Sequence, residues 1–223
     1  MSLMMQVALT VGPLAAYFFI VGAWQSGKHP RVVAGPVDFA VLLFGVSGLL
    51  TVGPIGQVLM GVIFPKAHWA WAWGLWLIFL ALWARVFAFA ASRRMVVYNI
   101  EPDRLAREVA AVLAGIPDSH FTPRLGGFEA IEEGRAIHVE GIKFLRVGTV
   151  DARGRDPVAL IRALRTLLRE RLKAVPSGPT GVTWGLFVIS WLTLLGPLAT
   201  FLVTEPSARA AMRALWIRIT RGP

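Results

Sequence analysis

The sequence predicts a membrane protein with four transmembrane helices, a small α+β domain inserted before the fourth helix, and a C-terminal amphipathic helix. Only 16% of the 223 residues are charged and 56% are hydrophobic, whereas an ordinary soluble domain carries about 25% charged residues. The charges are missing from long continuous runs, as in membrane spans. Between residues 95 and 177 the composition changes to that of a globular domain. We therefore expect membrane regions at 1–94 and 178–223, separated by a soluble domain.

The first predicted span covers about residues 4–24, because no charge precedes Lys28. This length crosses a bilayer at about 1.5 Å per residue. A cleaved signal peptide is the alternative, and it would carry a basic start and small residues before the cleavage site. The first residues contain no Lys or Arg, and AAYFFIVGAWQ is bulky, so we expect an uncleaved span.

The second predicted span, about 38–64, is rich in helix-breaking residues. They are Gly45, Gly48, Gly53, Pro54, Gly56 and Gly61. One interpretation is close helix packing through small residues with a proline kink. The other is a broken helix that exposes its backbone to an ion or a substrate. We favour packing, and the absence of a strand–turn–helix context argues against a nucleotide-binding loop.

The third predicted span, about 69–92, begins with a tryptophan cluster and ends beside two arginines. The interface residues predicted here are Trp69, Trp71, Trp73 and Trp76 at one end and Arg93 and Arg94 at the other. Indole has an apolar body and one N–H donor, so it favours the boundary between headgroups and hydrocarbon. The tryptophans spread around the helix, which fits surrounding lipid better than a slot for an aromatic ligand.

Arg85 lies two turns inside this third span, roughly 12 Å from Arg93 along the helix. Charged side chains inside a membrane are costly and are candidates for function. One hypothesis is that Arg85 extends toward the headgroups as an anchor. The other is an intramembrane pair with Asp38, which starts the antiparallel second span near the same membrane face.

The fourth predicted span, about 182–204, is followed by a basic amphipathic tail. Met212, Leu215, Trp216 and Ile219 share one helical face, and Arg209, Arg213 and Arg218 lie largely elsewhere. Such a helix lies in the membrane interface with its aromatic residue at headgroup level. Docking to a partner subunit is the alternative, and Arg209 and Arg213 would then contact the partner.

Four spans place both termini on one side of the membrane and residues 93–181 on the other. Near the membrane, the domain side holds Lys28, Arg31, Arg93, Arg94, Arg169, Arg171 and Lys173, and the opposite side holds Lys66, Arg209, Arg213, Arg218 and Arg221. The excess on the domain side predicts a cytoplasmic domain. The basic tail argues for the opposite orientation.

The domain is predicted to have the order β-α-β-β-β-α, with two helices on one face of a mixed or antiparallel sheet. MVVYNI is the first strand, and EPDRLAREVAAVLAG is a helix that buries Leu105, Val109, Val112 and Leu113. HFTPR, GFEAI, AIHVE and KFLRVGTV are strand candidates, one of them uncertain, with EEGR as a hairpin turn. The last helix starts at Asp156-Pro157 and buries Ile161, Leu164, Leu168 and Leu172.

A basic stripe runs along the last helix, away from its apolar face. It consists of Arg162, Arg165, Arg169 and Lys173. Helical spacing places these side chains on one side. The stripe is either a solvated surface or a contact for anionic headgroups or an acidic partner.

The sequence offers no pattern typical of catalysis or metal binding, so we expect no catalytic site, no metal and no cofactor. There is no cysteine, which excludes disulfides and thiolate sites. The histidines His29, His68, His120 and His138 lack metal-ligand spacing. The carboxylates around the hairpin, Glu129, Glu132, Glu133 and Glu140, fit a solvated turn better than acid–base work, and Ser119-His120 is only a sequence neighbour pair. The net charge of +10 indicates contact with anionic lipid and not nucleic acid, because no nucleic-acid-binding motif is present.

Three function classes remain as hypotheses. The first is a non-catalytic scaffold or accessory subunit, which presents the soluble domain to a protein partner or to a second copy of the chain. The second is an oligomeric small transporter or channel component that uses Arg85 and the broken second helix. The third is a membrane enzyme, for which Asp38, His29 and the acidic residues of the domain are the candidates. The first is preferred.

Overall fold

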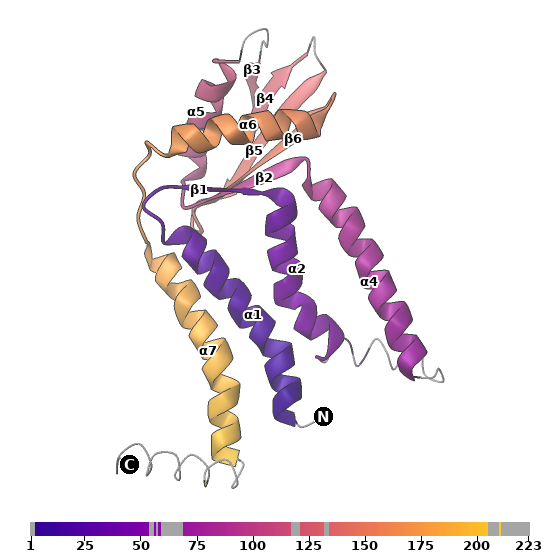
Figure 1. Ribbon diagram of the computed structural model, residues 1–223. Coiled ribbons are helices and arrows are strands. Elements are labelled where there is room, and N and C mark those ends of the chain that lie inside the picture. The colour runs from indigo at the N-terminus through magenta and orange to yellow at the C-terminus, as the bar shows by residue number, and fades with distance from the viewer. Residues whose placement is uncertain are drawn as a thin grey trace.

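The computed structural model describes residues 3–53, 56, 58, 69–116, 121–131, 134–204 and 210. Within these residues the helices are α1 (Leu3–Gln25), α2 (Gly35–Thr51), α4 (Trp69–Ala91), α5 (Pro102–Leu113), α6 (Pro157–Leu172) and α7 (Gly181–Thr204). The strands are β1 (Arg31–Ala34), β2 (Arg94–Tyr98), β3 (Thr122–Arg124), β4 (Gly127–Ala130), β5 (Arg135–Ile142) and β6 (Val147–Gly154). The long helices α1, α2, α4 and α7 extend from one side of the sheet (Figure 1).

The strands form one antiparallel sheet in the order β1-β2-β6-β5-β4-β3. The four strand candidates after the first domain helix, one of them left uncertain, all correspond to strands, namely β3, β4, β5 and β6. The predicted order β-α-β-β-β-α did not include β1, which comes from the connection between the first two long helices and pairs with β2 from Arg31↔Tyr98 to Ala34↔Met95. Four residues beside a predicted span carry no alternation long enough to indicate a strand.

The first core lies between the sheet and the helices α5 and α6, as the helix periodicity predicted. All the predicted core residues are buried, namely Leu105, Val109, Val112, Leu113, Ile161, Leu164, Leu168 and Leu172. The predicted start of α6 is confirmed as well. The Asp156 carboxylate accepts a hydrogen bond from the Ala159 N–H, and Pro157 occupies the first turn. Both helices therefore cover one face of the sheet (Figure 1).

A second core lies on the opposite face, where the sheet meets the long helices. Side chains alternate between the two faces of a strand, so Met95 and Val97 of β2 enter the first core while Val96 and Tyr98 enter the second. Val21, Trp24 and Val33 complete the second core. The sheet is therefore packed on both sides, between two short helices and the ends of the long ones.

Close helix packing explains two of the glycines in α2. A Cβ atom at Gly48 would lie 2.5 Å from the Thr10 carbonyl oxygen of α1 and nearer still to that of Leu9. A Cβ atom at Gly45 would lie 2.6 Å from the Tyr17 Cβ. Small residues at these positions let the two backbones approach each other. The packing interpretation of Gly45 and Gly48 is therefore supported.

Two of the described helices are long and apolar enough to cross a membrane, which weakly suggests membrane association. Their apolar windows are Gln6–Gln25 in α1 and Trp73–Ala91 in α4, whereas those of α2 and α7 are shorter. As helices, α1, α4 and α7 have nearly the predicted bounds. The helix α2 begins at Gly35 and ends at Thr51. Most of the remaining predicted second span and the predicted tail helix lie outside the described residues.

Candidate functional site

The connection between α1 and β1 is fixed by hydrogen bonds to the sheet domain. The Asn99 side-chain amide donates to the Gly27 carbonyl at 3.1 Å, and the Ser177 N–H donates to the Lys28 carbonyl at 2.8 Å. The His29 Nδ1 lies 3.2 Å from the Val175 carbonyl oxygen. Asn99 is 1% exposed and has a φ of 63°, a left-handed conformation that asparagine tolerates better than most residues. This connection is therefore held in one position by partners distant in the sequence.

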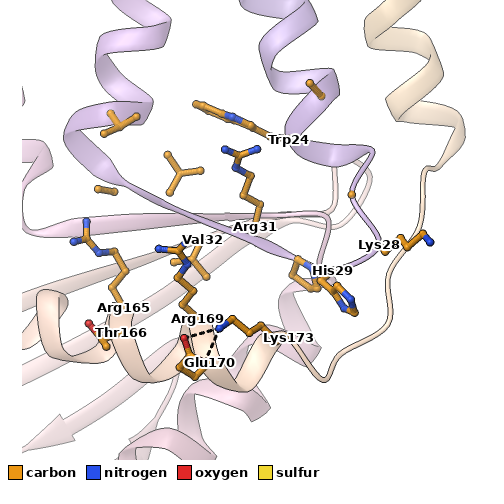
Figure 2. Close-up of a pocket in the computed structure, with 16 residues that line it drawn as sticks. Trp24, Lys28, His29, Arg31, Val32, Arg165, Thr166, Arg169, Glu170 and Lys173 are labelled. Atoms are coloured by element: carbon orange, nitrogen blue, oxygen red, sulfur yellow. Dashed lines mark hydrogen bonds and ion pairs between the residues drawn. The ribbon is translucent and has the colours of Figure 1, made fainter.

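A cleft of about 780 Å³ lies between this connection and α6. Its principal side chains are Trp24, Lys28, His29, Arg31, Val32, Arg165, Thr166, Arg169, Glu170 and Lys173. Figure 2 shows Arg31 extending from β1 toward Trp24, while Arg165 and Arg169 extend from α6 toward β1 on the other side of the strand. The cleft therefore has basic side chains on both of its walls.

The charge of this cleft is largely uncompensated. Among the described residues that line it, Glu170 carries the only carboxylate, and Lys173 binds this carboxylate with N–O distances of 2.7 and 2.8 Å. The Arg31 guanidinium lies 5.8 Å from the centre of the Trp24 ring, which is within cation–π range. Among the described residues, no hydrogen bond or ion pair links the side chains of Lys28, Arg31, Arg165 or Arg169 to a protein acceptor. No described carboxylate or carbonyl group therefore competes with a ligand for these four cations.

The predicted basic stripe enters this cleft only in part. Arg165, Arg169 and Lys173 line it and Arg162 does not. Sequence reasoning missed that Lys28 and Arg31 belong to the same site, because they were interpreted as charges flanking a span. The signal that could have joined them to α6 was the apolar RVVA segment, whose pairing with β2 brings it beneath α6.

The predicted pair of Arg85 and Asp38 is not brought together. Asp38 lies in the first turn of α2 and accepts a hydrogen bond from the Tyr98 hydroxyl of β2. Arg85 is exposed on α4, and no ion pair joins it to Asp38 in the part of the chain that the structure describes. Asp38 turns toward the sheet because its helix starts directly against β2. Burial, followed by the hydrogen bond to Asp38, raises the pKa of Tyr98.

The predicted interface tryptophans have different surroundings. Trp71 is 75% exposed, whereas Trp76 is 7% exposed and donates its indole N–H to the Leu50 carbonyl of α2 at 3.2 Å. Trp73 is half-buried. The contacts of Trp76 are thus with protein, and the headgroup role of Trp71 stays a prediction. The side chain of Trp69 lies outside the described residues, as do Trp216, Arg209 and Arg213.

The two arginines after the end of α4 lie where the chain enters the sheet. Arg93 is exposed, and its guanidinium lies 5.6 Å from the centre of the Phe89 ring. Arg94 is half-buried as the first residue of β2, and it lies opposite Asp151 of β6 in the strand register. Their position at a membrane interface stays a prediction.

The other residues considered for catalysis or metal binding form no common site among the described residues. Glu129 forms an ion pair with Arg124 at 3.3 Å, and His138 lies in β5 opposite Gly127 and Asp151. No group of three potential metal ligands is found among the described residues. The predicted neighbours Ser119 and His120, together with His68, Glu132 and Glu133, lie outside them. No family model, curated protein or solved structure matches this chain.

Proposed function

We propose that this chain is an integral membrane protein whose four long helices cross the bilayer, and that it acts as a non-catalytic scaffold or accessory subunit. In this proposal the sheet domain is presented at the membrane surface for interaction with another protein or a second copy. The observation that carries it is the second core, in which Trp24 of α1 and Val33 of β1 pack with Tyr98 of β2. This packing makes the domain and the helices one unit, as presentation of a binding surface requires.

The exposure of α4 supports membrane insertion. Only 11% of its apolar window is buried, and the window lies far from the N-terminus. A core helix of a soluble protein would be mostly buried, and a signal sequence would lie at the start of the chain. The large apolar side chains exposed on α4 include Leu75, Leu77, Ile78, Phe79, Leu82, Trp83, Val86, Phe87 and Phe89. A lipid bilayer around α4 would cover this apolar surface, which favours membrane insertion.

The packing of the other long helices supports four spans and not two. The helices α2 and α7 both pack along α1, and the Ser190 hydroxyl of α7 donates to the Ala15 carbonyl of α1 at 2.8 Å. If α1 crosses the membrane, its two neighbours lie in the same layer. Lys28, Arg31, Arg93 and Arg94 lie at the domain end of this bundle, which favours a cytoplasmic domain.

The free edge of the sheet supports a protein partner. Among the described residues, β3 is terminal in the sheet and pairs with β4 alone. Terminal strands offer unpaired backbone groups to another chain. Leu125, which directly follows β3, is fully exposed. This surface is the first place to look for the partner.

Tagged purification from native membranes in mild detergent, followed by native mass spectrometry, tests the proposal. We expect a stoichiometric partner protein or a second copy of the chain. Leu125→Asp should weaken this association. Leu167→Asp, the control at an exposed leucine on α6, should leave it unchanged. Release of the chain from membranes by alkaline carbonate would contradict membrane insertion. A chain that is retained by membranes but purifies alone as a monomer would contradict the scaffold role.

The alternative of a small transporter or channel component receives less support. Gly45 and Gly48 are occupied in helix packing, so they do not expose backbone to a solute. Arg85 is exposed on α4 and does not reach Asp38. A path built on Arg85 would require further copies of the chain around α4.

A further inference from the structure

We propose that the cleft between the α1–β1 connection and α6 binds the phosphate-bearing headgroup of an anionic membrane phospholipid. This inference rests on the proposed membrane insertion and assigns a specific lipid site to the protein. The site consists of Lys28, Arg31, Arg165, Arg169 and Lys173, with Trp24 at its helix end.

The arginines of the cleft match the chemistry of a phosphate group. A guanidinium presents a planar set of N–H donors that binds phosphate oxygens in pairs, and it keeps its charge at all relevant pH values. Arg165 and Arg169 extend from α6 toward one side of β1, whereas Arg31 extends from the other side of β1 toward Trp24 (Figure 2). All three arginines line the cleft. No described protein acceptor binds these three side chains. An anion that binds Arg165 or Arg169 therefore gains contacts without breaking a described hydrogen bond or ion pair, whereas at Arg31 it shares the guanidinium with the Trp24 ring.

The cleft is organised before a ligand arrives. The backbone of residues 27–29 is held by Asn99, Ser177 and Val175, and Arg31 is held against Trp24. The strand β1 pairs on one side only, so alternate backbone groups along its free edge remain available for hydrogen bonds. Fixed donors lower the entropy cost of binding.

The position and polarity of the cleft favour a lipid over a soluble anion. The cleft lies where α1 ends at Gln25 and α2 begins at Gly35, which is the membrane surface if these helices span. Its helix side includes the apolar residues Ala23, Trp24 and Val37, whereas the cations of α6 line the other side. This order, from apolar to cationic, matches the order from acyl chains to phosphate in a phospholipid. The volume also falls in the range of about 300–1,000 Å³ that is typical of ligand sites.

The carboxylate of Glu170 provides a test in which anion binding should change in the direction opposite to that caused by removing a cation. Glu170 is exposed and occupies Lys173. Replacement by glutamine removes the negative charge and frees the ammonium group, while the side chain keeps nearly the same volume. If the cleft binds an anion, Glu170→Gln should strengthen binding, whereas Arg31→Gln and Arg169→Gln should weaken it.

The experiment uses the full chain in nanodiscs of phosphatidylcholine with increasing phosphatidylglycerol, and native mass spectrometry counts the lipids retained. We expect the wild-type chain to retain phosphatidylglycerol in preference to phosphatidylcholine. Each removed cation should weaken this retention about fivefold, and Glu170→Gln should increase it about as much. Arg162→Gln is the matched control, because Arg162 is exposed on the same helix but lies outside the cleft. The preference should also fall as salt increases.

Several outcomes would overturn the inference. Equal retention of the two lipids by the wild-type chain would do so, as would equal effects of Arg169→Gln and Arg162→Gln. If the chain binds glycerol 3-phosphate saturably but shows no lipid preference, the cleft is a site for a soluble phosphate. If the cleft crosslinks to an acidic protein, it is a site for a peptide. Failure of the chain to stay in carbonate-washed membranes would instead refute the proposed function, so the two failures are distinguishable.

Discussion

Replacement of Gly48 by alanine tests whether α1 and α2 pack as closely as the structure shows. The added Cβ would lie 2.5 Å from the Thr10 carbonyl oxygen and nearer still to the Leu9 carbonyl oxygen. Ordinary carbon contacts need about 3.5 Å, so the two helices must separate by about 1 Å. The obstructing atoms belong to the backbone of a helix and cannot rotate away as a side chain would.

Gly48→Ala is expected to lower the unfolding free energy, although alanine has a higher helix propensity than glycine. Overpacking of this kind costs about 1–3 kcal/mol of unfolding free energy. At Gly12 of α1 a Cβ atom would meet nothing within 4 Å, so Gly12→Ala should instead stabilise the helix by about 1 kcal/mol. The two variants should therefore differ by about 2–4 kcal/mol. For a chain of this size the difference corresponds to roughly 4–16 °C in Tm.

Thermal unfolding in mild detergent, followed by tryptophan fluorescence, measures this difference. Gly48→Ala should melt below the wild-type chain, and Gly12→Ala should melt at or above it. Equal melting temperatures for the two variants would refute the reasoning, because they would mean that α2 does not approach α1 at Gly48. A parallel count of copies by native mass spectrometry excludes a change in oligomeric state as the cause.

Three further outcomes follow from the described contacts. Tyr98→Phe should lower the unfolding free energy by about 1–3 kcal/mol, because the Asp38 carboxylate loses its donor. Burial and that hydrogen bond raise the pKa of Tyr98 above 10.0, so the unfolded chain releases the phenol proton first. The stabilisation is therefore complete below pH 10 and is lost progressively as the pH rises further. The difference in Tm between the wild-type chain and Tyr98→Phe should be constant from pH 8 to 10 and should start to shrink between pH 10 and 11. Leu168→Ala should cost about 2–5 kcal/mol in the same melt since Leu168 is fully buried, whereas Leu167→Ala at the exposed neighbouring position should cost about 0.5 kcal/mol or less. Arg85→Leu should leave expression and Tm unchanged, and loss of solute flux in proteoliposomes with expression intact would favour the transporter hypothesis instead.

The helices of the domain were predictable because each carries its own signal. In α5 and α6 the apolar residues recur at helical spacing, and the side chains that repeat, such as Leu105 with Val109 and Leu164 with Leu168, are buried in the first core. The start of α6 is encoded locally as well, because an aspartate followed by proline caps a helix whatever surrounds it. These features depend on neighbours within four residues and not on the rest of the fold.

The strand β1 was not predictable, and half of the candidate site depends on it. Its four residues carry too short a pattern, and its partner β2 follows more than 60 residues later in the numbering, from Tyr98 back to Met95. Without β1 the sequence shows Arg165, Arg169 and Lys173 as a stripe on a helix surface, open to interpretation as solvated charge. The missing wall of the cleft, from Lys28 to Arg31, is created by a tertiary contact that no local propensity encodes.

The alternation within β1 links the cleft to the helices. Val33 enters the second core with Trp24 and Tyr98, and Arg31, two residues earlier, lies on the same face and reaches the Trp24 ring. Val32 faces the other way, packs against the first core and lines the cleft below α6. One short strand thus contributes to both cores, and Arg31 and Val32 on its two faces both line the cleft. If a headgroup occupies the cleft as proposed, it binds the strand that joins the domain to the helices, so bound lipid should raise the Tm of the whole chain and not of the domain alone.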